Sequence, residues 1–107
     1  MSSKATPPIV SVVVRSMGRP TLDRTLARIA AQTHRPLEIV LIDASGSLGE
    51  PAERHIPIVI VRKGPLDRPR AANAGLDAAR GGYLIFLDED DEIESTHVTE
   101  LLDALAR

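Results

Sequence analysis

Apolar and polar residues form two kinds of pattern along this chain: continuous apolar runs, and segments in which apolar residues recur at helical spacing. The order of these patterns predicts the elements of the fold. Four short, largely apolar runs, the first nearly all β-branched, are typical of strands in a buried sheet. These runs cover residues 9–14, 38–42, 56–61 and 83–87. In three other segments the apolar residues recur at helical spacing, which indicates helices with one buried face. The predicted order is strand, helix, strand, strand, helix, strand, helix.

Local signals predict where these helices begin and end. Thr21 is expected to cap the first helix with its hydroxyl, and Ser95 to cap the last. Pro36 is expected to end the first helix, and Gly81 and Gly82 the second. The predicted buried face of the first helix consists of Leu22, Leu26, Ile29 and Ala30. That of the last consists of Val98, Leu101, Leu102 and Leu105.

Alternating strands and helices imply a parallel sheet with right-handed crossovers. We expect an α/β fold with a doubly wound, mainly parallel sheet of strand order 3-2-1-4 and helices on both faces. The connection at 44–55 is long enough for a crossover and has room for a short helix. In such sheets ligands bind at the carboxyl ends of the strands, where the order reverses. Arg15 and Ser16, Asp43, and the acids at 88–91 all follow strands there, so we expect them to converge on one crevice.

The acidic run after the fourth strand is the main candidate for a metal site. Six of the seven residues at 88–94 are acidic, and their repulsion would be offset by a bound cation. A ligand set made only of carboxylate oxygens suits Mg²⁺ or Mn²⁺. These ions bind one or two carboxylates of a protein together with substrate phosphates. Asp88 and Asp90 are two residues apart, so both can face one site. The alternative is a solvated loop that favours the next helix N-terminus; the place at the switch point favours the metal.

Other polar residues have both a binding and a local interpretation. Asp43 can accept hydrogen bonds from a base or a ribose, or it can close a local turn onto Ser45 or Gly46, and the sequence leaves this open. Four arginines are placed to neutralise a diphosphate, because a guanidinium offers paired donors to phosphate. The alternative for each of them is a solvated surface. They are Arg15, Arg19, Arg68 and Arg70.

Composition narrows the class of protein. The 107 residues predict one domain, at 9–107, after a loose tail at 1–8. The chain has no cysteine, which suits the cytoplasm, and no apolar run of the roughly 20 residues that a membrane span needs. The near balance of 13 basic and 15 acidic residues argues against a nucleic-acid partner, and Tyr83 and Phe86 are the only aromatic residues for base stacking. P-loop and G-x-G-x-x-G motifs are absent.

Taken in order, the motifs resemble those of family-two glycosyltransferases with the GT-A fold. The matching segments are 10–14 with Arg19-Pro20, Leu26 through Gln32-Thr33, 36–40 with Asp43, 71–76, and 81–91 with its D-x-D sequence. The resemblance implies transfer of a sugar from a nucleotide-diphospho-sugar donor to an acceptor hydroxyl. It assigns the divalent metal to Asp88 and Asp90, donor contacts to Asp88, and the base to Asp43. Arg15 and Arg70 are expected to assist at the diphosphate.

The chain also departs from the pattern of that family. The usual pair of acids after the second strand is here Asp43-Ala44, and Met17 stands where an aromatic residue is usual, so the base stays open. The family continues beyond this length with the acceptor site and the general base, so we expect a donor-binding half truncated before them. A non-catalytic nucleotide-sugar or metal-binding module is the alternative. A phosphoacceptor domain is the third hypothesis. It would need a lysine near the strand ends to contact the phosphoryl group, and neither Lys4 nor Lys63 is convincingly placed for this. The strand at 83–87 is expected to have an open edge. We therefore expect a homodimer that forms through this strand or through the final helix.

Overall fold

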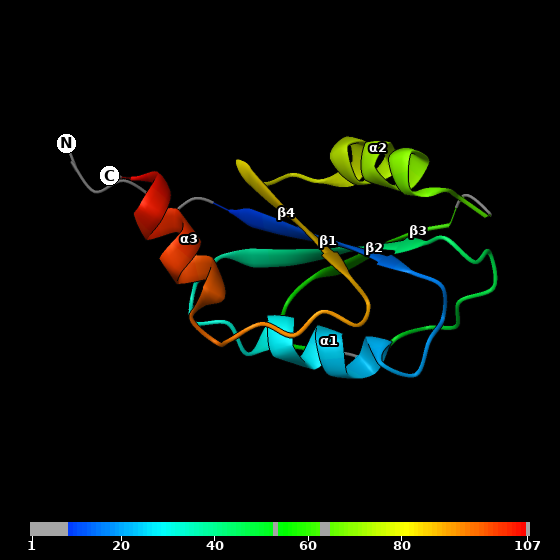
Figure 1. Cartoon of the computed structure of the whole chain (residues 1–107), viewed down its shortest axis with the longest axis horizontal. Helices are drawn as coiled ribbons and strands as arrows, with labels where there is room; N and C mark the ends of the chain where they lie inside the picture. Colours follow the sequence, from blue (N-terminus) through cyan, green and yellow to red (C-terminus); the bar gives the residue numbers. More distant parts are fainter. Residues whose placement is uncertain (1–8, 53, 63–64, 107) are drawn as a thin grey trace.

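The computed structural model describes residues 9–52, 54–62 and 65–106 and contains one four-stranded parallel sheet (Figure 1). Its strands are β1 (Val10–Ser16), β2 (Leu37–Asp43), β3 (Ile58–Val61) and β4 (Tyr83–Asp88). Its helices are α1 (Leu22–Ala30), α2 (Arg68–Ala78) and α3 (His97–Leu105). The strand order is β3-β2-β1-β4, which confirms the predicted doubly wound topology.

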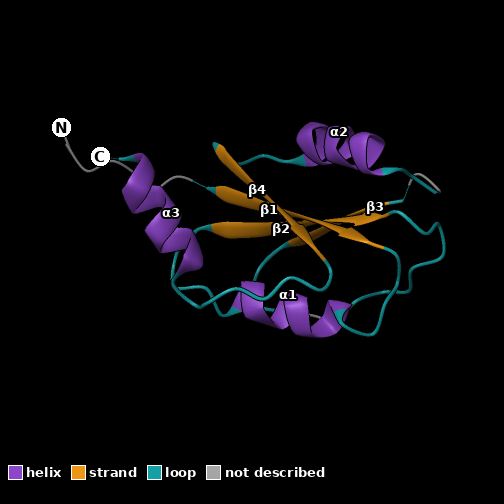
Figure 2. Ribbon diagram, in the orientation of Figure 1, coloured by secondary structure: helices purple, strands orange, loops and turns teal. Residues whose placement is uncertain are grey.

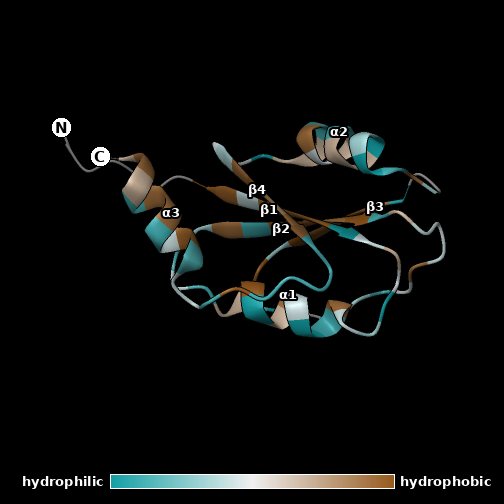
Figure 3. Ribbon diagram, viewed as in Figure 1, coloured by the Kyte–Doolittle hydropathy of each residue, from teal (hydrophilic) through white to brown (hydrophobic). Residues whose placement is uncertain are grey.

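The helices cover both faces of the sheet. Figure 2 shows α1 on one face and α2 on the other, while α3 lies beyond the end at which β1 and β4 start. Side chains alternate between the two faces along each strand. In β1, Val12 and Val14 therefore join the core against α1, and Val13 joins the core against α2. The strands form the apolar centre of the molecule in Figure 3.

Small residues let α2 pack closely on β1. Ala71 and Ala74 are buried in the cluster that contains Val13. A Cβ atom added to Gly75 would lie 2.5 Å from Cγ1 of Val13, so the glycine permits this approach. The helix begins after Asp67, whose side chain accepts a hydrogen bond from the Arg70 amide. This cap fixes the first turn of α2 beside the carboxyl ends of the strands.

A buried carboxylate lies near the opposite, amino-terminal end of the sheet. Glu38 of β2 accepts hydrogen bonds from the Ser11 hydroxyl at 2.5 Å and from the Arg80 amide at 2.8 Å. The Arg80 side chain donates another at 3.1 Å, and the Gly81 amide donates to the Ser11 oxygen. Burial alone raises the pKa of Glu38, but the hydrogen bonds from Ser11 and Arg80 outweigh it and lower the pKa below its usual value. This network joins β1 and β2 to the segment that leads into β4.

Both signals predicted for the ends of the first helix were wrong. Thr21 stands at the N-cap of α1, but its hydroxyl makes no capping bond and is buried without a partner among the described residues. Helix α1 ends at Ala30 rather than at Pro36. Just beyond this end, the Gln32 side chain donates to the Glu94 carbonyl and accepts from the Val98 amide, and the Arg35 side chain donates to the Ala30 carbonyl. The Gln32 contacts tie the end of α1 to the start of α3.

Other element limits also differ from the expectations. Helix α2 ends at Ala78, before the glycine pair, since the amides of Arg80 and Gly81 bond to Glu38 and Ser11 instead. Helix α3 begins after Thr96, one residue later than expected. The described part of the 44–55 connection contains no helix. In the part of the chain that the structure covers, no helix combines the length and apolarity that crossing a membrane requires.

Candidate functional site

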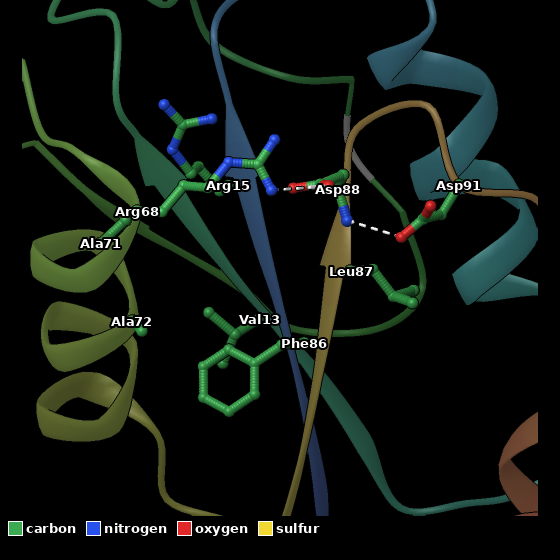
Figure 4. Close-up of a pocket in the computed structure, with 9 residues that line it drawn as sticks. All are labelled: Val13, Arg15, Arg68, Ala71, Ala72, Phe86, Leu87, Asp88 and Asp91. Atoms are coloured by element: carbon green, nitrogen blue, oxygen red, sulfur yellow. Dashed lines mark hydrogen bonds and ion pairs between the residues drawn. The ribbon is translucent and has the colours of Figure 1, made fainter.

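A pocket of about 270 Å³ opens where the carboxyl ends of β1 and β4 meet the start of α2 (Figure 4). It is lined by Val13, Arg15, Arg68, Ala71, Ala72, Phe86, Leu87, Asp88 and Asp91. Arg15 and Asp88 are direct register partners on β1 and β4, so their side chains leave the sheet on the same face. The pocket therefore has an apolar floor and a charged rim at the switch point of the sheet.

Two arginines, Arg15 and Arg68, and two carboxylates, Asp88 and Asp91, define the charge of this rim. Nη1 of Arg68 lies 3.4 Å from Oδ2 of Asp88. Arg15 places one guanidinium nitrogen 3.6 Å from the Met17 sulfur, while its Nε is buried without a hydrogen-bond partner among the described residues. In Figure 4 the Arg68 guanidinium group reaches Asp88, the Arg15 guanidinium group lies farther from Asp88 than that of Arg68, and Phe86 and Val13 lie farther back along their strands. Guanidinium groups that line a pocket offer paired donors to a ligand with phosphate oxygens.

The acidic segment folds back on itself as a turn. The Asp91 amide donates to the Asp88 carbonyl at 3.1 Å, and the Asp88 amide donates to Oδ2 of Asp91 at 2.8 Å. Asp91 thus uses one carboxylate oxygen to close the turn, and Asp90 is exposed at the tip. The Asp88 side chain is 43% exposed.

The metal expected at Asp88 and Asp90 stays a prediction. No group of three or more acidic, histidine or cysteine side chains is arranged to hold a metal within residues 9–52, 54–62 and 65–106. Two carboxylates do match what Mg²⁺ takes from a protein when phosphates and water complete its shell. Asp88 is half-exposed, and Asp90 makes no hydrogen bond or ion pair with the described residues. The donor chemistry therefore fits a phosphate-bound Mg²⁺ or Mn²⁺.

Asp43 occupies a different environment. It is 2% exposed, and Oδ1 accepts hydrogen bonds from the Ser45 hydroxyl at 2.8 Å and the Gly46 amide at 2.9 Å. Oδ2 accepts from the Leu48 amide at 3.1 Å and lies 3.6 Å from Arg62. Burial raises the pKa of Asp43, but these hydrogen bonds outweigh it and lower the pKa. Asp43 therefore closes a local turn, and a contact with a base stays a prediction.

The pocket collects only some of the predicted site residues. Arg15 and Asp88 line it, whereas Asp43, Asp90 and Arg70 are not among its lining residues. Asp43 is the register partner of Ser16, which follows Arg15, so strand alternation sends Asp43 and Asp88 to opposite faces of the sheet. The three polar clusters thus share one end of the sheet but not one pocket.

On α2 the pocket arginine is Arg68. The Arg70 side chain is exposed and lies 4.0 Å from Asp67. Arg68 shares a helix face with Ala71, Ala72 and Gly75, because residues three, four and seven apart lie on one side of a helix. That spacing is visible in the sequence and would have selected Arg68 once Ala71 was taken as the buried position.

Sequence reasoning also missed Glu89. The sequence predicts only one more acid of the run at this position, but Glu89 is 2% exposed and faces the loop after β1. Its place at the centre of D-x-D gave no signal of burial. The alternation of side chains along β4 did give such a signal. Glu89 falls on the same face of the sheet as Ile85 and Leu87, which pack against the core that α1 covers.

The sheet topology and the place of the pocket define a Rossmann-like α/β domain of the GT-A type. The profile of the family described as "Glycosyl transferase family 2" matches residues 9–107. The chain therefore belongs to this family, whose general chemistry is sugar transfer.

Two relatives support the assignment. The chain is 32% identical over 95 residues to the "Uncharacterized glycosyltransferase EpsJ" of Bacillus subtilis (strain 168), an alignment that covers 82% of this chain and 28% of EpsJ. It is 31% identical over 102 residues to the "Succinoglycan biosynthesis protein ExoO" of Rhizobium meliloti (strain 1021), covering 91% of this chain and 29% of ExoO. The chain thus spans less than a third of the length of these relatives.

Solved structures agree on the fold. S. aureus TarS superposes with a TM-score of 0.67 at 18% identity, covering 91% of this chain and 19% of that structure. A TarS structure of residues 1–349 gives 0.61 at 20% identity, covering 91% of this chain and 31% of that structure. At this identity the likeness shows the fold alone.

Proposed function

We propose that this chain is the donor-binding part of a glycosyltransferase that uses a nucleotide-diphospho-sugar and a divalent metal. The observation that carries the proposal is the pocket at the switch point, which Arg15, Arg68 and Asp88 line above an apolar floor and in which Arg68 pairs with Asp88. A diphosphate would meet two guanidinium groups there, and the apolar floor gives room for a less polar part of the donor. Membership of the family supplies sugar transfer as the chemistry.

In this proposal Asp88 and Asp90 hold Mg²⁺ or Mn²⁺, which when bound stabilises the negative charge of a leaving diphosphate. Arg15, which lines the pocket, would donate from its guanidinium group to a phosphate oxygen. Arg68 is paired with Asp88 without ligand and would turn to the phosphate when the donor binds. The proposed acceptor is a hydroxyl, and we assign no residue as its general base.

A non-catalytic nucleotide-sugar or metal-binding module is the second candidate. The same pocket favours it, because binding needs only the arginines, the acids and the apolar floor. Donor hydrolysis separates the two candidates. Release of free sugar that requires Asp88 would indicate an enzyme, and tight binding without release would indicate a module.

Binding is tested by thermal unfolding with Mn²⁺ and a panel of nucleoside diphosphates. A ligand at 100 times its Kd stabilises the folded state by about 2.7 kcal/mol, so the melting temperature should rise. Asp90→Ala should remove most of this rise, whereas Asp77→Ala, the same change at an exposed position of α2, should keep it. An undiminished rise in Asp90→Ala would refute the metal assignment.

A further inference from the structure

Glu89 is a buried carboxylate whose two oxygens both receive donors from the loop after β1. Oε1 accepts hydrogen bonds from the Ser16 hydroxyl at 3.1 Å and from the Arg19 amide at 2.8 Å. Oε2 accepts from the Met17 amide at 2.7 Å and lies 3.9 Å from Nε of Arg19. A charge buried in this way is costly unless it is well hydrogen-bonded, and here the loop backbone supplies those bonds.

The loop is shaped around this carboxylate. The Ser16 oxygen also accepts from the Gly18 amide at 2.9 Å, and Gly18 has a φ of 78°, a conformation that favours glycine. The main chain of Glu89 is held separately, because the Thr25 hydroxyl of α1 donates to the Glu89 carbonyl. One residue thus joins three segments: the loop at 16–19, helix α1 and the acidic turn at 88–91.

We propose that Glu89 is a positioning residue that locks the acidic turn to the loop after β1 and thereby fixes the main chain of Asp88 and Asp90. This inference rests on the proposed function, in which those two acids hold the metal. Glu89 itself points to the α1 face, away from the pocket, so it acts through the backbone and not by touching the ligand. With the lock removed, the two carboxylates would have to be ordered at the moment of binding, which lowers affinity.

The first test uses amide hydrogen exchange, without any ligand, to measure whether Glu89 holds the acidic turn in place. Glu89→Gln keeps the size of the side chain but turns an NH₂ group toward at least one of the amides of Met17 and Arg19. A lost bond to a charged acceptor should speed amide hydrogen exchange by about tenfold or more at Met17, Arg19 and Asp91. Exchange at Ile39, in the centre of the sheet, should stay unchanged. Unchanged exchange at Asp91 would overturn the proposal.

The second test measures Mn²⁺ with UDP or GDP by calorimetry, well below the melting temperature. Glu89→Gln should weaken binding about tenfold or more, because the lost bonds involve a buried charge. Glu92→Gln is the matched control: it removes the same charge from the same segment, but its side chain is 77% exposed and pairs with Arg28. It should change affinity by no more than about twofold.

The outcomes separate the possible failures. Wild-type affinity in Glu89→Gln would mean that the residue is only structural, even if the variant melts earlier. If the wild-type chain binds neither diphosphate, the proposed function fails. In that case hydrogen exchange at Asp91 alone decides whether Glu89 holds the acidic turn in place. If Glu89→Gln does not fold, Thr25→Val replaces it, since this change removes the bonds from the Thr25 hydroxyl to the Glu89 and Asp91 carbonyls and leaves the Glu89 carboxylate in place. Faster exchange at Asp91 in Thr25→Val supports the lock, and unchanged exchange overturns it.

Discussion

Replacing Gly75 by alanine tests how closely α2 packs on the sheet below the pocket. The new Cβ would lie 2.5 Å from Cγ1 and 3.2 Å from Cγ2 of Val13. Both partners are fixed, because Val13 is a β-branched residue in the middle of β1 and Gly75 lies within α2. The helix must therefore move away from β1, or Val13 must leave its preferred rotamer.

Two opposing terms set the size of the effect. Alanine in a helix interior is favoured over glycine by about 1 kcal/mol. Forcing an extra methyl group into a packed contact costs typically about 1–3 kcal/mol. We therefore expect the free energy of unfolding to fall by up to about 2 kcal/mol, although helix propensity alone would raise it.

Denaturant unfolding followed by circular dichroism measures this change. Gly82→Ala is the control, because an added Cβ there meets nothing within 4 Å. Val13→Ala removes both methyl groups that cause the clash, so in the double variant the two changes should couple favourably by about 1 kcal/mol or more. Stabilisation of Gly75→Ala by the full helix-propensity term, with no coupling to Val13, would refute the packing argument.

Two further predictions concern pH and assembly. Glu38 and Asp43 have pKa values lowered from 4.5 and 3.8, so their contribution to stability is present above those values and is lost as the pH falls through the folded-state pKa values. Urea unfolding should show a steep loss of stability below about pH 4.5, and Glu38→Gln should flatten it; an equal slope in that variant would contradict the assignment. Because β4 is an edge strand and Phe86 and Leu105 are 50% and 65% exposed, we expect the chain to self-associate. Sedimentation equilibrium should show species above 11.5 kDa that Leu105→Glu reduces, and a monomer at all concentrations would contradict this.

The sequence predicted the sheet and its order well because burial itself produces the pattern. A strand covered on both faces must be apolar at consecutive positions, and β1 and β2 are buried along nearly their whole length. Helix α1 shows the same logic, since Leu22, Leu26 and Ile29 recur at helical spacing and are all buried. Once strands and helices alternate, few topologies remain.

Element ends were predicted poorly because contacts distant in sequence determine them. Gln32 bonds to Glu94 and Val98, which lie more than sixty residues away, and it follows α1, which ends at Ala30 well before Pro36. Thr21 has the residue type and position of a cap, yet its hydroxyl makes no capping bond. Local preference states what a residue can do, and the tertiary partners decide what it does.

The site was predicted in part, and the errors have one geometric cause. Position along a strand brought Arg15 and Asp88 together correctly, because parallel strands end at the same edge. Side-chain direction was applied at this site only to Asp88 and Asp90, so the sequence prediction selects Arg70 instead of Arg68 and does not separate Glu89 from the other acids of the run. Periods of 2 in the strand and 3.6 in the helix carry this information.

The contacts of the Asp43 carboxylate oppose a direct role of this residue in binding a base. Its carboxylate already accepts three hydrogen bonds from Ser45, Gly46 and Leu48 and lies beside Arg62. A base that bound Asp43 would have to displace some of these donors and open the turn that they close, which costs about 1–3 kcal/mol for each buried group left unpaired. Asp88 is half-exposed and needs no such opening. A donor would therefore be held first at Asp88 and the two pocket arginines, and a contact at Asp43 would require rearrangement of the segment at 45–48.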